Sequence, residues 1–205
     1  MSIAIVTSVS GAIAELAALT LPNKLEYCLR HGYTLIADNQ PYGEAVSRTD
    51  RLIPYLDRFA AIWTLDADAI ITNMTQRIEE VPGLGDEVTV CYERIVDWNA
   101  LNCGSMVWRD TASARGLLRE IASKHGEWKD LPCGWQSWLG DWHGPLTCLS
   151  PKSMNSVEWT HPANSADWNP GSHWTPGDLV YHPCGVYPAV VRLRRIRERL
   201  DEVVR

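Results

Sequence analysis

Two carboxylates interrupt a largely apolar run in the middle of the chain. The segment from Ala61 to Asn73 contains Asp66 and Asp68. These aspartates would not be buried in such a segment without a positively charged partner. An ionised carboxylate in an apolar setting is costly without a positive partner, and a divalent cation is one such partner. Because side chains two positions apart on an extended segment point the same way, both aspartates can converge on one ion while Ala67 turns into the sheet. The alternative is a strand end whose aspartates cap the next turn.

The segments before this pair predict a sheet with crossover helices. Ile3 to Thr7 is a β-branched run typical of a buried strand, and Tyr33 to Ala37 is a second short strand. Between them, Pro22 to His31 is predicted as a helix, with apolar residues at helical spacing, namely Leu25, Cys28 and Leu29. The order strand, helix, strand indicates an α/β domain with a mostly parallel central sheet flanked by helices.

A further helix, Ser47 to Phe59, leads directly into the strand that carries the two aspartates. In open α/β sheets ligands bind at the carboxyl ends of the strands. Topology therefore favours the cation site over the capping alternative. After it, Val88 to Tyr92 and the segment up to Arg109 predict strands, and Ala112 to His125 predicts a helix.

Composition limits the classes of function. A chain of 205 residues has room for one good core, so we expect one domain, with a net charge of -6 that argues mildly against a surface for nucleic acid. No apolar run approaches the roughly 18 to 20 residues of a membrane span, and the amino terminus lacks a basic leader, so we expect a cytoplasmic protein. The 6 cysteines show no Cys-x-x-Cys pair, so we expect reduced thiols.

Tryptophan is unusually frequent, with 10 residues against a single phenylalanine. Several lie in polar, Gly- and Pro-rich surroundings between residues 126 and 178, namely Trp128, Trp135, Trp138, Trp142, Trp159, Trp168 and Trp174. An aromatic face with an indole N–H suits a sugar ring, whereas core packing is the simpler explanation. Because this region shows little periodicity, we expect loops that cover the sheet and shape the acceptor side of a pocket.

A histidine near the end of the chain completes the candidate metal ligands. The short strand Leu179 to Tyr181 delivers His182 at its end. A lone histidine is more often structural than a ligand. Beside two aspartates, however, it becomes a plausible third ligand for a manganese-type ion, which accepts carboxylate and imidazole together.

Five segments, in this order, resemble GT-A fold glycosyltransferases, with the galactosyl/xylosyl/mannosyltransferase family of yeast mannan and plant xyloglucan enzymes closest and the glycogenin-like family next. They are Asn23-Lys24 through His31-Gly32-Tyr33, Leu65 to Ile71, Asn102-Cys103-Gly104, Trp135-Gln136 and Gly177 to Gly185. The resemblance covers residues 3 to about 190 and implies retaining, metal-dependent transfer of a hexose or pentose from a UDP- or GDP-sugar to a hydroxyl acceptor. It also implies that Asp66, Asp68 and His182 bind Mn²⁺ or Mg²⁺.

The resemblance assigns further roles residue by residue. Asn102 and Gly104 match the family segment that touches the donor sugar, and Gly185 matches the glycine that lets the backbone approach the diphosphate. Thr7 and Ser8, at the end of the first strand, would meet the nucleoside. The family resemblance also divides the chain into a nucleotide-sugar half, 1–125, acceptor-side loops with the metal histidine, 126–190, and a basic terminal helix, 191–205.

Gln136 matches the family's glutamine on the reacting face of the sugar. Since an amide is a poor nucleophile, we assign it electrostatic support of an oxocarbenium-like centre. Two departures concern charge: Trp135 replaces an acidic residue, and Tyr187 replaces a basic residue that helps to hold the diphosphate. Arg51 or Arg192 would compensate. The family's Golgi members carry an amino-terminal anchor that is missing here, which favours a bacterial or viral version.

The arginine-rich segment 191–205 predicts an amphipathic helix docked by its apolar side chains. The alternative is a contact with an anionic membrane surface or with nucleic acid, as an enzyme that glycosylates hydroxymethylated DNA bases would need. Two other function classes also stay open. One is a nucleotide-sugar hydrolase, which uses the same donor site with water as acceptor, and the other is a carbohydrate-binding module without catalysis.

Overall fold

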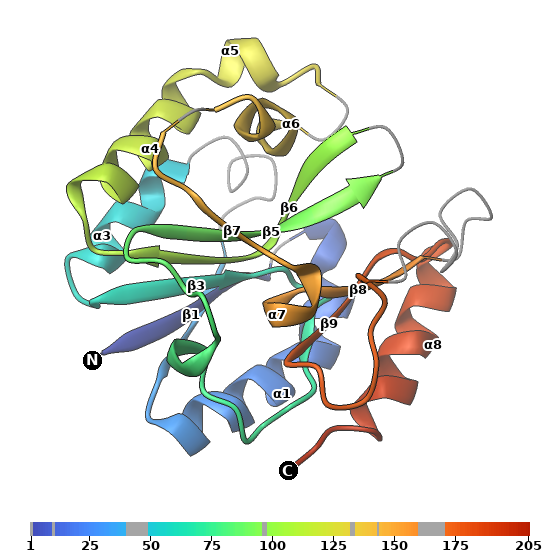
Figure 1. Ribbon diagram of the computed structural model, residues 1–205. Helices are drawn as coiled ribbons and strands as arrows, with labels where there is room; N and C mark the ends of the chain where they lie inside the picture. Colours follow the sequence, from blue (N-terminus) through green and yellow to red (C-terminus); the bar gives the residue numbers. More distant parts are fainter. Residues whose placement is uncertain are drawn as a thin grey trace.

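The chain folds into a mixed α/β domain, with helices on both sides of a central sheet (Figure 1). The computed structural model describes residues 2–9, 11–39, 49–95, 98–131, 134–142, 144–159 and 171–205. The strands are β1 (Ile3–Ser8), β2 (Thr34–Asp38), β3 (Ala61–Leu65), β4 (Ile70–Ile71), β5 (Val88–Ile95), β6 (Trp98–Arg109), β7 (Thr147–Leu149), β8 (Ser156–Trp159) and β9 (Val180–Gly185). The expected α/β class is confirmed.

The helices include several short ones. The α-helices are α1 (Ala14–His31), α3 (Ile53–Leu56), α4 (Ala112–Ser123), α5 (His125–Trp128), α6 (Trp135–Gly140), α7 (Pro151–Met154) and α8 (Ala189–Leu200). The 3₁₀ helices are η1 (Gly11–Ile13), η2 (Thr49–Leu52) and η3 (Ile78–Glu80). Among the described helices, none is both long enough and apolar enough to cross a membrane.

The main sheet has the strand order β2-β1-β3-β6-β5-β7. β1 pairs in parallel with β2 and β3, and β7 pairs in parallel with β5, whereas β6 runs antiparallel to both of its neighbours. Parallel pairs are therefore in the majority, as expected. A second sheet, with the order β4-β9-β8, was not predicted, because its strands are short and β8 lies in the aperiodic region.

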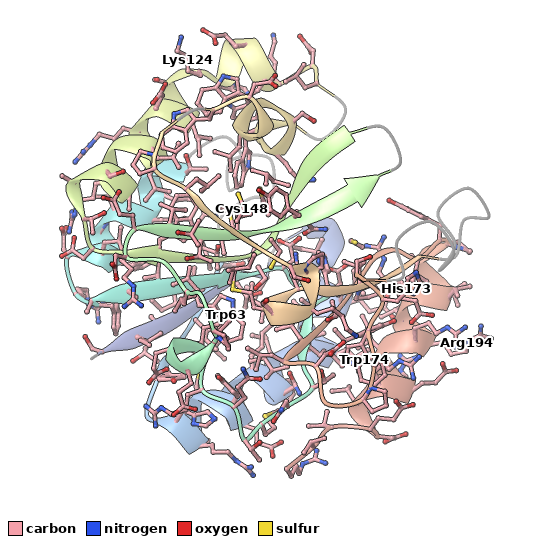
Figure 2. All side chains as sticks on the ribbon, viewed as in Figure 1. Trp63, Lys124, Cys148, His173, Trp174 and Arg194 are labelled. Carbon is pink, nitrogen blue, oxygen red and sulfur yellow. The ribbon has the colours of Figure 1, made fainter. Side chains whose placement is uncertain are left out.

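Strand β1 is buried on both faces, which explains its continuous apolar sequence. Ile3 and Ile5 belong to the core beneath α1, and Ala4 and Val6 belong to the core beneath α4. Figure 1 shows α1 on one side of the sheet and α4 with α6 on the other. Trp63 is fully buried in the α1 core, whereas Lys124 and Arg194 project from the periphery (Figure 2).

Helix α1 corrects part of the predicted apolar face: Cys28 is buried, but the two leucines are not. It begins well before Pro22, which it contains, and Leu25 and Leu29 are 46% and 75% exposed. Its buried face carries Asn23 and Lys24 instead, because these polar side chains bind main-chain groups of residues 66 to 71. The predicted end is confirmed, since Gly32 adopts a left-handed conformation with φ 73°.

The helix predicted over Ser47 to Phe59 is shorter in the structure. Only η2 and α3 form within its described part, and Pro54 lies in the first turn of α3, where its missing N–H is harmless. Leu52 and Leu56 are buried. The cysteines that the structure describes form no disulfide, as expected, and Cys133 lies outside the described residues.

The region from residue 126 to 178 contains more regular structure than expected. It forms α5, α6, α7, β8 and the edge strand β7. Trp128 is buried and donates to the Ile121 carbonyl at 2.7 Å, and Trp174 donates to Thr72 Oγ1 at 3.0 Å. Core packing therefore accounts for both. Trp138 and Trp142 also pack against the α4 core; Trp168 and the side chain of Trp159 lie outside the description.

Helix α8 is the predicted docked amphipathic helix. Ile196 is fully buried between α8 and the small sheet. Its arginines meet acidic partners: Arg195 lies 3.2 Å from Glu158, and Arg199 lies 2.8 Å from Glu202. Because acidic side chains of the same protein pair with these arginines, the helix gives no support to a nucleic-acid contact.

Candidate functional site

The two aspartates lie in a turn directly after β3. The Asp66 amide donates to the Gly104 carbonyl at 2.8 Å, and the Ala69 amide donates to the Asp66 carbonyl at 3.1 Å. The expected extended segment is thus wrong, because the chain leaves the sheet at Asp66 and turns back toward β4. The turn nevertheless brings both carboxylates toward the same point.

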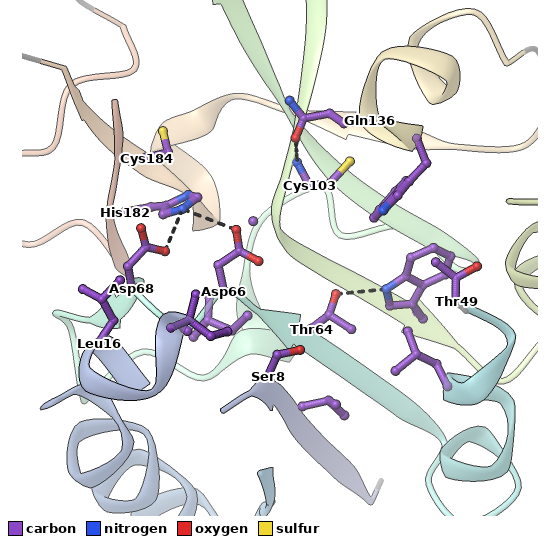
Figure 3. Close-up of a pocket in the computed structure, with 18 of the residues that line it drawn as sticks. Ser8, Leu16, Thr49, Thr64, Asp66, Asp68, Cys103, Gln136, His182 and Cys184 are labelled. Atoms are coloured by element: carbon purple, nitrogen blue, oxygen red, sulfur yellow. Dashed lines mark hydrogen bonds and ion pairs between the residues drawn. The ribbon is translucent and has the colours of Figure 1, made fainter. Parts of the chain in front are cut away.

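Asp66, Asp68 and His182 form a compact cluster (Figure 3). One ligand atom from each lies within 4.8 Å of the others. His182 Nε2 is 3.3 Å from Asp68 Oδ1 and 3.6 Å from Asp66 Oδ2. The antiparallel pairing of β4 with β9, which aligns Ile70 with Tyr181, holds the histidine beside the turn. Sequence reasoning placed His182 at the end of a strand, whereas it lies inside β9.

Exposure differs sharply within the cluster. The Asp66 side chain is 60% exposed, that of Asp68 is 11% exposed and that of His182 is 3% exposed. Burial opposes ionisation of Asp68, but the His182 ring when it is protonated, together with Arg192, whose Nη1 lies 2.8 Å from Asp68 Oδ2, holds the pKa of the Asp68 carboxyl below its usual range. Two carboxylates and an imidazole nitrogen are a donor set that suits Mn²⁺ or Mg²⁺, so these residues fit the implied metal.

The Lys24 side chain stabilises the turn that follows β3. Its Nζ donates to the carbonyl oxygens of Asp66 at 2.9 Å and Ala67 at 3.3 Å, and to the hydroxyls of Thr20 at 3.1 Å and Thr7 at 3.3 Å. The side chain is fully buried, and burial lowers the pKa of its amine to about 7 although both aspartates oppose this. Sequence reasoning gave Lys24 no role, because a lysine in a helix normally faces solvent.

Replacing Lys24 with methionine is expected to destabilise the fold by about 2 kcal/mol, because buried carbonyl groups lose their donor. Urea unfolding with a fluorescence readout measures this. Lys124→Met is the matched control: Lys124 is 43% exposed and pairs with Glu127 at the surface. That substitution should stay within about 0.5 kcal/mol of wild type. Equal stabilities for the two variants would contradict the structural role of Lys24.

A cavity of about 350 Å³ opens above the cluster. This volume lies in the range of small-molecule sites. The predicted site residues that line it are Ser8, Arg51, Asp66, Asp68, Gly104, Gln136 and His182. Tyr187, Arg192 and Trp135 line it as well. The structure therefore gathers most of the predicted site around one space.

Two predicted residues, Thr7 and Asn102, do not line this cavity. Thr7 is buried and its hydroxyl accepts from Lys24. Gly185 is the last residue of β9, and its surroundings lie outside the description. Asn102 is 4% exposed, and its Oδ1 accepts from the Gly104 amide at 2.9 Å. Its amide is thus engaged inside the protein, beside Asn155, a residue that sequence reasoning missed because it lies in the aperiodic region.

Gln136 and Gly104 both line the cavity. Gln136, on α6, accepts a hydrogen bond at its Oε1 from the Cys103 amide at 2.9 Å (Figure 3). Gly104 lets the imidazole approach, since a Cβ there would lie 2.1 Å from His182 Cε1. Arg51, which also lines the cavity, forms an ion pair with Asp38.

Comparison with known proteins yields structural likeness only. No family model and no curated protein matches the sequence. A glycosyltransferase involved in glycosylation of the major capsid of PBCV-1 superposes with a TM-score of 0.73 at 18% identity, over 97% of this chain and 100% of that one. GlyE from Streptococcus pneumoniae gives 0.64 at 13% identity, over 98% of this chain and 61% of that one.

The galactosyltransferase LgtC, solved with donor and acceptor sugar analogues, gives a TM-score of 0.55 at 12% identity, over 98% of this chain and 96% of that one. At these identities the likeness concerns the course of the backbone. The strand order, the turn after β3 and the shared architecture lead to one conclusion: this chain has the GT-A fold of glycosyltransferases.

Proposed function

We propose that this protein is a metal-dependent glycosyltransferase that uses a nucleotide-diphosphate sugar as donor and retains the anomeric configuration. The observation that carries the proposal is the cluster of Asp66, Asp68 and His182 at the floor of a cavity of about 350 Å³. A divalent cation held by these three side chains would supply positive charge where a departing diphosphate develops negative charge. The fold, shared with solved glycosyltransferases, supports the same reading.

Arg192 is the protein cation best placed to bind the diphosphate. Its guanidinium is held by Asp68 at 2.8 Å and by the carbonyls of Val186 at 3.2 Å and Cys184 at 3.3 Å. It also stacks over the Tyr187 ring, 5.1 Å from the centroid. These contacts fix a planar, permanently charged group beside the cluster, which suits phosphate oxygens. Arg192 would thus supply the positive charge beside the diphosphate that is lost because Tyr187 replaces a basic residue.

Replacing Arg192 with glutamine is expected to raise KM for the donor about tenfold, because one charge-assisted contact to the diphosphate is lost. Steady-state kinetics with varied donor, together with UDP binding by calorimetry, measure this change. The control is Arg194→Gln on the same helix, where the side chain is 64% exposed and pairs with Glu198. An unchanged KM in Arg192→Gln would remove this arginine from the donor site.

Gln136 is proposed to face the anomeric carbon. Its Oε1 already accepts one hydrogen bond, from the Cys103 amide, and keeps a second lone pair. A fixed amide oxygen stabilises an oxocarbenium-like centre by electrostatics without becoming a nucleophile. In this scheme the acceptor hydroxyl attacks from the face that the leaving group vacates, and the diphosphate takes its proton, which gives retention.

Different residues of the cavity lining are proposed to bind the two substrates. Ser8, the last residue of β1, and Arg51, on η2, are proposed to bind the nucleoside, and Trp135, on α6, is proposed to contact the acceptor. We propose a UDP- or GDP-sugar as donor and a glycan hydroxyl as acceptor. Trp135 offers the apolar face that a sugar ring requires.

The decisive experiment mixes purified protein with Mn²⁺ or Mg²⁺ and a panel of UDP- and GDP-sugars. Metal-dependent donor binding, and transfer to an added glycan with the anomeric configuration retained by NMR, are the expected results. Turnover that needs no acceptor would indicate a hydrolase. Binding of glycans without binding of any donor would indicate a carbohydrate-binding module. An oligonucleotide with hydroxymethylated bases serves as an additional acceptor.

A further inference from the structure

The buried edge of the His182 ring contacts a side chain that has no place in the scheme above. Nδ1 lies 3.0 Å from Asn155 Oδ1, on the opposite edge of the ring from Nε2, which faces Asp66 and Asp68. Asn155 is completely buried. An imidazole nitrogen either donates or accepts, so the distance alone leaves open which nitrogen carries the proton.

Main-chain groups of β6 determine the orientation of the amides around His182. The Gly104 N–H, which can only donate, lies 2.9 Å from one terminal atom of the Asn102 amide, so this atom must be the oxygen. The Asn155 nitrogen Nδ2 lies 2.8 Å from that oxygen and 3.3 Å from the Asn102 carbonyl oxygen. Both oxygens accept only, so the amino group of Asn155 points toward Asn102 and its Oδ1 points toward His182.

The geometry points to Asn155 as a positioning residue: we propose that it keeps a proton on His182 Nδ1 and so reserves Nε2 for a divalent cation. The inference rests on the metal-dependent function proposed above. With the amides reversed, the ring would carry its proton on Nε2 and His182 would donate a hydrogen bond to Asp68 instead of offering a lone pair to a cation. A metal-bound histidine commonly donates its other N–H to an oxygen, which fixes the ring in this way.

Burial makes this arrangement difficult to replace. His182 is 2% exposed, so water has little access to take over the hydrogen bond from Nδ1. The backbone of Asn155 is fixed as well, because its amide donates to the Pro151 carbonyl at 2.8 Å at the end of α7. The end of α7 thus places the Asn155 side chain against the edge of the His182 ring that faces away from Asp66 and Asp68.

The first test uses the wild-type protein without metal or donor. Long-range ¹H–¹⁵N correlation spectra of labelled histidine, assigned with His182→Gln, show which ring nitrogen is protonated. A protonated Nδ1 is expected in metal-free protein and again after Mg²⁺ is added. An unprotonated Nδ1 in either sample would overturn the inference. Because no sugar transfer is measured, this outcome is independent of whether the protein is a glycosyltransferase.

The second test compares two substitutions at the same position. Asn155→Leu removes the acceptor and is expected to weaken Mn²⁺ binding about tenfold to a hundredfold, measured by calorimetry. Asn155→Asp keeps an acceptor toward His182 but replaces the donor toward the two Asn102 oxygens, so it should keep the Nδ1 proton and lose less affinity than Asn155→Leu, at the cost of a lower Tm. Equal losses of affinity, with Nδ1 protonated in both variants, would reduce Asn155 to a packing role and overturn the inference.

A matched control separates stability from metal affinity. Asn23 is another buried asparagine, and it exchanges two hydrogen bonds with the main chain of Ile71. Asn23→Leu should lower Tm while leaving Mn²⁺ affinity unchanged. An equal fall in affinity for Asn23→Leu and Asn155→Leu would show that affinity merely follows stability, against the inference. If Asn155→Leu does not fold, the spectra of the wild-type protein still decide the question.

Discussion

Asp68→Asn is expected to abolish metal-dependent sugar transfer, with kcat/KM falling by roughly 10³-fold or more, the order of loss when electrostatic stabilisation of the transition state is removed. The substitution removes one of two carboxylate ligands and leaves Arg192 without its anionic partner at 2.8 Å. Both changes make the cluster more positive and less able to bind a cation. Mn²⁺ titration by calorimetry and transfer assays measure the two effects separately.

A rise of Tm with added Mn²⁺ gives a further readout. A ligand at 100 times its Kd stabilises the folded state by about 2.7 kcal/mol. The wild-type protein should show this shift, and Asp68→Asn should not. Asp178→Asn is the control: Asp178 is 13% exposed and pairs with Lys152 at 2.7 Å, away from the cavity. Undiminished transfer by Asp68→Asn would refute the metal site.

Gly104→Ala is expected to displace the histidine of the cluster. The added Cβ would lie 2.1 Å from His182 Cε1 and 2.6 Å from Nδ1, so the ring must move. We expect a loss of stability of about 1 to 3 kcal/mol from overpacking. Metal affinity should fall by about tenfold or more, because Nε2 leaves the carboxylates. Urea unfolding and Mn²⁺ calorimetry measure the two losses.

Gly116→Ala is the control for this substitution. Gly116 lies within α4, and an added Cβ there meets nothing within 4 Å. Alanine should stabilise the protein by about 0.5 to 1 kcal/mol, since it favours the helix. If Gly104→Ala bound Mn²⁺ as tightly as Gly116→Ala, the close packing of His182 against residue 104 would have no functional importance.

The sequence allowed the central strands and the grouping of Asp66, Asp68 and His182 to be predicted, for different reasons. Ile3 to Thr7 and the run before Asp66 are buried on both faces, so their apolar composition alone is enough to predict them as strands. The link between Asp68 and His182 depends on two strands that are distant in sequence, and only the ligand chemistry of the residues and the family resemblance suggested it. The pairing of β4 with β9 explains why that resemblance locates the histidine correctly.

Lys24 and Asn155 could not be predicted, because each is a polar residue whose burial is determined by tertiary contacts. On α1, the apolar spacing of Leu25 and Leu29 suggested the wrong buried face, since hydrogen bonds to the turn after β3 outweigh it. Beyond residue 126, short elements pair with distant strands, as β7 does with β5. Periodicity does not reveal such pairing.

The small sheet has a consequence for local unfolding. Asp68 precedes β4 and His182 belongs to β9, so separating these two strands would part the carboxylate from the imidazole. A cation that binds only the assembled cluster therefore penalises this opening. Amide hydrogens along β4 and β9 should consequently exchange with deuterium more slowly when Mn²⁺ is present, while those of β2, at the distant edge of the main sheet, should be unaffected.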